Sequence, residues 1–254
     1  MENSNFSFFP MEIKELIFQH MTGTEILKMS EVSTEFYNFF AYSTTCMKKI
    51  KLRLARKDFN DDEKSFFIES IRRYQNLEVA GFSESIKVAE ELIKRTVTLF
   101  KTIYINYVDF DTKTDALNFF AVIENSIAEL RMNQVYINLD LGQQDLKIQN
   151  FKFARLKVLE TKCCQGLFFN EVFVNCNSLE TFVVKSGSTI STSAHEALKK
   201  ILKSNKGLKI LGIHFNVFNL LFSENISDFC SFKLSEFHAN DLYRVLPCVN
   251  GEYI

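Results

Sequence analysis

Histidine, cysteine and serine side chains could act as metal ligands or nucleophiles, but their spacing in this chain fits neither role. The four histidines, His20, His195, His214 and His238, show no HExxH or other short metal-ligand spacing. No Gly-x-Ser-x-Gly motif is present to hold a nucleophilic serine. None of the six cysteines forms a Cys-x-x-Cys pair, so no redox motif or zinc knuckle is indicated. We therefore expect no catalytic residue, no metal and no cofactor, and we expect a protein that is not an enzyme.

Two charged clusters lie next to each other along the chain. The basic cluster comprises Lys48, Lys49, Lys51, Arg53, Arg56 and Lys57. Its default interpretation is a solvated face, and contact with phosphate or an acidic protein surface is the alternative. The acidic cluster, residues 61–63, precedes a predicted helix, where carboxylates favour the positive end of the helix dipole.

The composition excludes several classes of protein. The chain has 254 residues, of which 46% are hydrophobic and 24% charged, and its net charge is −1. It thus lacks the basic excess typical of nucleic-acid binding. Its 8 glycines form no phosphate-binding fingerprint of the Rossmann or P-loop type. No signal peptide or membrane-length apolar run is apparent. We expect a cytoplasmic or nuclear protein with free thiols and without nucleic-acid or membrane partners.

The first forty residues predict three short helices. Pro10 suits a first helical turn, and Ile13, Leu16, Ile17 and Met21 follow as one apolar stripe. Thr24 can cap a second helix that carries Ile26, Leu27 and Met29. Ser33 or Thr34 can cap a third, which carries Phe36, Tyr37, Phe39 and Phe40. Such a small unit buries little surface, so it needs a neighbour in its own chain, a partner, or both.

The order of these residues resembles an F-box. The match runs through Phe9-Pro10, Ile13, Leu16-Ile17, Met21, Ile26-Leu27, Val32-Ser33 and Phe36. Phe9 stands where the family usually has Leu, Ser33 where it often has Cys, and Phe36 where it often has Trp. The resemblance implies a small all-α F-box over residues 1–46 that binds the Skp adaptor of a cullin-based ubiquitin ligase. The implied adaptor-binding residues are Pro10, Ile13, Leu16, Ile17, Met21, Leu27 and Phe36.

The rest of the chain repeats an L-x-x-L-x-L pattern. Its units start at Met47, Tyr74, Phe100, Ile127, Leu156, Leu179, Leu208 and Leu234, at intervals of 23 to 29 residues. Helical apolar spacing occurs between them, in segments 62–73, 85–95, 114–125, 166–176 and 193–204. The alternative, an ordinary α/β domain, would need Gly-rich or polar loops at the strand ends, which we do not find.

This pattern resembles irregular leucine-rich repeats, which often follow an F-box. It predicts an α/β solenoid of about eight strand–helix units over residues 47–254. The family's asparagine-or-cysteine position falls on Cys164 in the fifth unit and on Asn216 in the seventh. In the other units it falls on Ala55, Phe82, Val108, Val135, Gly187 and Leu242, so the usual polar ladder is mostly missing. Segment 241–249 is expected to cap the open C-terminal end, and the alternative is that this end meets a partner or a continuation of the stack.

The side chains that alternate with the apolar strand residues predict a binding surface on the concave side. Its candidate members are Lys51, Arg53, Tyr104, Arg131, Lys162, His214 and His238. Together the two resemblances imply a substrate-recognition adaptor that joins the Skp adaptor and cullin scaffold to an unknown protein substrate. We expect it to be a monomer within that complex. The alternative is a leucine-rich repeat binding or inhibitor protein with no link to ubiquitin, whose first helices only cap the solenoid.

Overall fold

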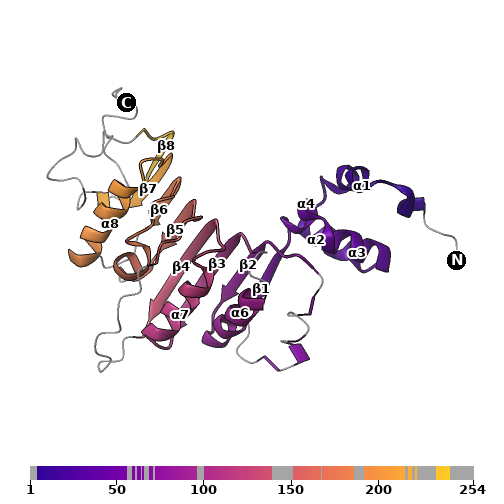
Figure 1. The fold of residues 1–254 in the computed structure, drawn as a ribbon, viewed down its shortest axis with the longest axis horizontal. Coiled ribbons are helices and arrows are strands. Elements are labelled where there is room, and N and C mark those ends of the chain that lie inside the picture. Colours follow the sequence, from indigo (N-terminus) through magenta and orange to yellow (C-terminus); the bar gives the residue numbers. More distant parts are fainter. Residues whose placement is uncertain are drawn as a thin grey trace.

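The computed structural model combines a helical unit at the N-terminus with a single parallel sheet covered by helices on one face (Figure 1). It describes residues 5–55, 59–60, 62–63, 65, 69–70, 72–95, 100–138, 151–166, 168–185, 192–214, 217–218, 221 and 233–240. The helical unit comprises the 3-10 helix η1 (Asn5–Phe8), α1 (Met11–Phe18), α2 (Gly23–Ser30), α3 (Thr34–Tyr42) and α4 (Thr44–Met47).

Side-chain caps fix where the short helices begin. Pro10 directly precedes α1, with a φ of −53°. Thr22, rather than the predicted Thr24, caps α2, because Thr22 and Glu25 bond to each other's backbone N–H in a capping box. Ser33 caps α3 as predicted and accepts a hydrogen bond from the Phe36 N–H at 3.2 Å. The starts of α2 and α3 are thus set by local polar side chains, whereas α1 begins after Pro10 without a side-chain cap.

The helical unit has a core of its own, built largely from phenylalanine. Phe18, Ile26, Phe39 and Phe40 are buried in it together with Cys46, Met47 and Ile50. The ring of Phe18 lies 5.0 Å from that of Phe40 and 5.6 Å from that of Phe39, measured between centroids. Edge and tilted contacts of this kind add to the area that each ring buries.

Eight strands form one sheet in which each pairs in parallel with the next in the chain. They are β1 (Lys51–Leu54), β2 (Asn76–Ala80), β3 (Thr102–Phe110), β4 (Glu129–Ile137), β5 (Val158–Lys162), β6 (Thr181–Lys185), β7 (Ile210–His214) and β8 (Glu236–Asn240). The helices α6 (Ser83–Arg95), α7 (Lys113–Ile123) and α8 (Thr192–Ser204) and the π-helical turn η2 (Phe169–Phe173) connect them. Figure 1 shows α6, α7 and α8 along the same side of the sheet. The predicted α/β architecture is confirmed, and its strand order is compatible with a solenoid.

The strand register agrees with the predicted unit starts in seven of the eight units. One row of paired residues faces the helices: Leu52, Leu77, Ile103, Leu130, Leu159, Phe182, Leu211 and Phe237. The prediction placed Ile50 in that row for the first unit, which is wrong by two residues. Because Met47 and Ile50 belong to the core of the helical unit, Leu52 and Leu54 fill the first strand's positions in the sheet core.

A backbone hydrogen-bond pattern recurs from strand to strand. The Gln75 carbonyl accepts from the N–H groups of Lys101 and Thr102, at 2.8 and 3.1 Å. The carbonyls of Lys101, Ala128, Lys157, Glu180 and Lys209 each accept two N–H groups of the following unit in the same way. The start of every strand from β3 to β8 is therefore hydrogen-bonded to the unit before it. These bonds satisfy backbone N–H and carbonyl groups at the starts of the strands.

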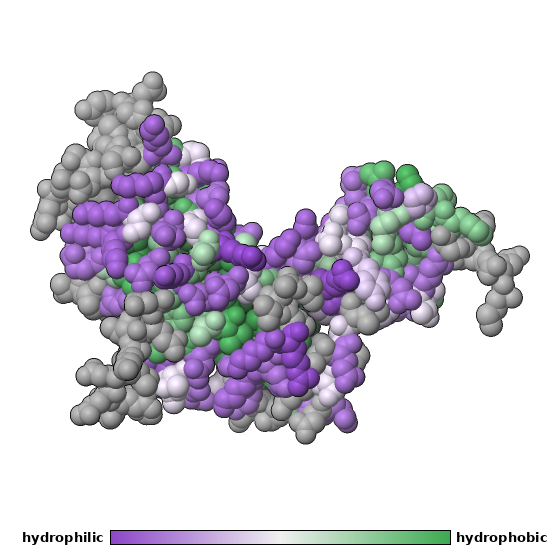
Figure 2. Space-filling view, viewed as in Figure 1, coloured by the Kyte–Doolittle hydropathy of each residue, from purple (hydrophilic) through white to green (hydrophobic). Residues whose placement is uncertain are grey.

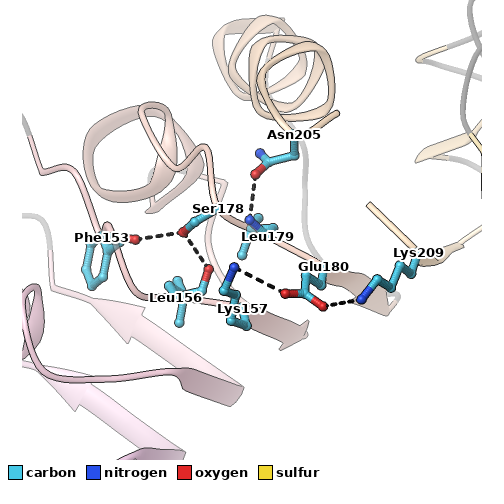
Figure 3. Close-up of polar contacts among 8 residues, drawn as sticks. All are labelled: Phe153, Leu156, Lys157, Ser178, Leu179, Glu180, Asn205 and Lys209. Atoms are coloured by element: carbon cyan, nitrogen blue, oxygen red, sulfur yellow. Dashed lines mark hydrogen bonds and ion pairs between the residues drawn. The ribbon is translucent and has the colours of Figure 1, made fainter. Parts of the chain in front are cut away.

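Side chains add further ties between neighbouring units (Figure 3). The Ser178 hydroxyl donates to the carbonyls of Phe153 and Leu156, at 3.1 and 2.8 Å. Asn205, 1% exposed, accepts from the Leu179 N–H at 2.7 Å and donates to the carbonyls of Cys176 and Ile201. Buried amides of this kind hold adjacent turns at a fixed separation.

At a column of left-handed residues the backbone turns, directly after β2 and β5 and within β3 and β4. Gly81, Tyr107, Gln134 and Cys163 occupy the same place in four successive units, with φ of 83°, 57°, 52° and 53°. Only glycine adopts this conformation without strain, so the three other residues are held there by their surroundings.

The buried column that follows these turns is mostly apolar. The predicted asparagine-or-cysteine position holds Val108, Val135 and Cys164, all buried, whereas Phe82 is 40% exposed. Apolar packing of Val108 and Val135 thus replaces the polar ladder in the third and fourth units. Gly187, Asn216 and Leu242, which were assigned to the same position, lie outside the described residues.

Three of the predicted helical segments match α6, α7 and α8 closely. Segment 166–176 instead forms the π-helical turn η2, around the buried rings of Phe169 and Phe173. Of the predicted helix over 62–73, residues 62, 63 and 65 are helical, whereas 69–70 and 72–73 are not. The remaining residues of that segment, and the whole predicted cap over 241–249, lie outside the described residues.

Candidate functional site

The first candidate surface is an exposed apolar stripe on α1. Leu16 is 56% exposed, Ile17 51% and Ile13 40%. Phe9 and Pro10 are also exposed and continue the stripe by one turn. We call these five residues the α1 surface. Figure 2 shows hydrophobic residues along the upper edge of the helical unit, where Figure 1 places α1.

The opposite side of α1 is anchored within the helical unit. Phe18 enters the core, and the Glu15 carboxylate accepts hydrogen bonds from the hydroxyls of Ser43 and Thr45, at 2.7 and 3.3 Å. These contacts fix the rotation of the helix about its axis. The exposure of the α1 surface follows from this orientation, because a helix of this length can bury only one stripe.

The seven residues assigned to adaptor binding divide into two groups. Pro10, Ile13, Leu16 and Ile17 lie together on the α1 surface. Met21, Leu27 and Phe36 are half-buried and pack against the core of the helical unit. The second group therefore supports the surface rather than forming its exposed part.

The helical unit is joined firmly to the start of the sheet. Tyr74 packs against both cores. The Gln75 side chain donates to the Thr44 carbonyl at 3.3 Å, and the Arg73 N–H donates to the Ala41 carbonyl at 3.1 Å. The Asn76 side chain donates to the Lys48 carbonyl at 2.6 Å. The unit therefore covers the first strand's end of the sheet core while the α1 surface remains exposed.

The second candidate surface is the sheet face opposite the helices, which we call the open face. It consists of the residues that alternate with the buried row, and it includes all seven of the predicted binding residues: Lys51, Arg53, Tyr104, Arg131, Lys162, His214 and His238. The structure does not bring them all together. His214 and His238 lie on adjacent strands at different registers, since His238 pairs with Gly212.

Ion pairs neutralise the N-terminal half of the open face. Glu78 lies 3.1 Å from Lys51 and 3.5 Å from Arg53. The Lys51 ammonium also lies 3.9 Å from the centre of the Tyr104 ring, a cation–π contact. Arg131 lies 3.1 Å from Glu160 and 3.5 Å from Glu129. The predicted cations of this half are therefore already paired.

The C-terminal half of the open face differs. Lys162 and Lys185 are exposed and lie directly opposite each other on β5 and β6. Neither ammonium forms an ion pair within the part of the chain that the structure describes. Alternation along the strands predicts both lysines on this face, although only Lys162 is among the seven candidate binding residues. The equivalence of their positions, four residues after Val158 and Thr181, was readable from the aligned units.

Buried thiols are poor nucleophiles in this fold. Burial raises the pKa of Cys164 to about 11 and that of Cys176 to about 12. Burial also raises the pKa of Cys46. These thiols remain protonated near neutral pH, so they pack as small apolar groups. None of the four described cysteines forms a disulfide, and Cys230 and Cys248 lie outside the described residues.

Within the described ranges, no three His, Cys, Asp or Glu side chains gather closely enough to hold a metal ion. No described helix combines the length and apolarity that would let it cross a membrane. Comparison of the chain with protein-family models and with curated proteins gives no significant match.

Proposed function

We propose that this chain is the substrate-recognition subunit of a Skp-cullin-F-box ubiquitin ligase. In this proposal the α1 surface binds the Skp adaptor, which connects to the cullin scaffold, and the open face of a leucine-rich repeat solenoid binds a target protein. The chain performs no bond chemistry. It acts by proximity, because holding a target lysine near a charged ubiquitin carrier raises the effective concentration of the two reactants.

The observation that carries the proposal is the exposure of the α1 surface. Ile13, Leu16 and Ile17 stay exposed to solvent after folding, and they are among the residues that the F-box resemblance assigns to adaptor binding. Contiguous apolar side chains on an otherwise polar helix are typical of a protein interface. The recurring strand entry and the spacing of the units support the repeat part of the proposal.

The test is capture of a purified Skp adaptor by the full chain. The double variant Leu16→Ala/Ile17→Ala removes two exposed apolar anchors, and truncating a central anchor typically weakens binding about 30-fold or more. Its unfolding free energy should change little, because both side chains are more than half exposed. Capture is measured by pull-down and by titration.

Tyr107→Ala is the matched control, because Tyr107 is 60% exposed on β3, away from α1. It should bind the adaptor like the parent chain. Unchanged binding of the double variant, or no capture by the parent, contradicts the proposal.

The contacts of Tyr74, Arg73 and Gln75 favour one other candidate. They let the helical unit act as the cap of a repeat protein that binds or inhibits its partner without a link to ubiquitin. A chain that fails to capture the Skp adaptor but binds a partner through the open face supports this second function.

A further inference from the structure

We infer that the C-terminal half of the open face binds an acidic segment of a protein, with Asp and Glu side chains contacting Lys162 and Lys185. This inference deepens the proposed function, on which it rests for its setting, by giving the chemistry of the target. It starts from the pairing of β5 and β6, which places two lysines side by side. Adjacent strands are about 4.8 Å apart, so the two ammonium groups are close enough to attract the same anionic group.

Two like charges directly opposite in a sheet repel each other, and the chain does not relieve this repulsion within its described residues. The nearest carboxylate along β5 is that of Glu160, two residues before Lys162, and it lies 3.1 Å from Arg131. Along β6, Val183 and Thr181 occupy the neighbouring positions on this face. A ligand carboxylate between the two ammonium groups would remove the repulsion and gain two ionic contacts.

A third group beside the lysines favours a peptide ligand. Asn133 pairs with Lys162 in the strand register, so it continues the same row on β4. Its Oδ1 atom is buried and has no hydrogen-bond partner among the described residues. A buried acceptor without a donor is costly, and rotation of the Asn133 amide toward the open face would let a backbone N–H of a bound peptide satisfy it. The row thus offers one acceptor and two cations to a single segment.

Nucleic acid fits the same row less well. A phosphodiester backbone has no N–H to donate to Asn133. A polyanion that continued along the sheet toward β1 would find no free cation among Lys51, Arg53 and Arg131, because each already pairs with a carboxylate. A short acidic segment needs to span only Asn133, Lys162 and Lys185, and it can leave the sheet on either side of them.

The test uses the full chain and a fluorescein-labelled peptide of alternating Asp and Glu, followed by fluorescence anisotropy. The variant Lys162→Glu/Lys185→Glu should weaken binding about tenfold or more. Rising salt should weaken binding to the parent chain. Lys87→Glu is the matched control, since Lys87 is an exposed lysine on α6, and it should bind like the parent. Thermal melting verifies that the variants are folded.

The same variants separate this inference from the proposed function. Capture of the Skp adaptor should be equal in the parent and in Lys162→Glu/Lys185→Glu, because the substitutions lie away from α1. If the parent chain does not capture the Skp adaptor, the proposed function is overturned, whereas the result with the acidic peptide still stands. Equal binding of the acidic peptide by Lys162→Glu/Lys185→Glu and by Lys87→Glu overturns the inference. So does binding of oligothymidylate that is tighter than binding of the acidic peptide. Binding of a phosphoserine peptide without binding of the acidic peptide also overturns it.

Discussion

The helical unit and the sheet bury similar apolar cores but have outer surfaces of opposite chemistry. The helical unit leaves Ile13, Leu16 and Ile17 exposed on α1. The sheet instead covers its open face with charged residues, many of them paired as Lys51 is with Glu78. Apolar exposure suits one constant partner bound through buried area, whereas a charged face gives selectivity among partners.

The two regions also differ in how their elements are held. Short helices with side-chain caps form the helical unit, and its core is small. In the sheet each strand from β3 to β8 is tied to the previous unit by the same pair of backbone hydrogen bonds. Such nearest-neighbour coupling spreads stability along the stack, so damage to one region should stay local unless Tyr74 couples the two cores.

The largest expected effect comes from removing a core ring in each region. Phe120 is fully buried, and its ring centre lies 5.7 Å from those of Phe168 and Phe173. Phe120→Ala should lower the unfolding free energy of the sheet by about 3–5 kcal/mol, measured by urea denaturation. Phe18→Ala should have an effect of similar size on the helical unit alone.

Amide hydrogen exchange tests whether those two losses are separate. Phe18→Ala should speed exchange in α1 to α4 and leave β3 and β4 protected. Leu16→Ala, which truncates an exposed residue of the same helix, is the control and should leave both regions protected. Faster exchange in β3 and β4 of Phe18→Ala would mean that the two cores unfold as one unit.

A smaller effect is expected from the polar ties between units. Asn205→Ala leaves the Leu179 N–H and the carbonyls of Cys176 and Ile201 without their buried partner. Unsatisfied groups of this kind cost about 1–3 kcal/mol, which urea denaturation would detect. Asn177→Ala alters an exposed amide nearby and should change stability by less than about 0.5 kcal/mol. Equal losses in the two variants would show that the buried amide has no special role.

Apolar periodicity predicted most of the sheet, because the buried row repeats at nearly regular intervals. It failed in the first unit, where Ile50 has the right spacing but the helical unit competes for it and buries it. It also missed the left-handed turns at Tyr107, Gln134 and Cys163, since none of these residue types marks such a turn. Backbone strain held by tertiary packing leaves no pattern in the sequence.

The α1 surface and the open face were predictable from the sequence to different extents. The resemblance indicated the residues of the α1 surface, but it did not separate exposed Leu16 on α1 from half-buried Leu27 on α2. The exposure of Leu16 depends on how α1 rotates onto Ser43. Alternation along the strands predicted the open face. Which of its cations are neutralised depends on cross-strand pairing, as for Arg131 and Glu160, and this pairing requires the register.

The smallest expected effect concerns pH and distinguishes the thiols of the two regions. Burial raises the pKa of Cys164 to about 11 and that of Cys176 to about 12, above the usual thiol value of 9.0. Above that usual value the unfolded chain loses its thiol protons while the folded chain keeps them, so the stability of the sheet falls as pH rises. From about pH 8 to about pH 10 the loss should be roughly 1 kcal/mol per thiol, measured by urea denaturation. Cys164→Ala/Cys176→Ala should remove most of this pH dependence, whereas Cys46→Ala, which alters the core of the helical unit, should leave it in the sheet. An equally steep loss in both variants would assign the alkaline destabilisation to groups other than these two thiols.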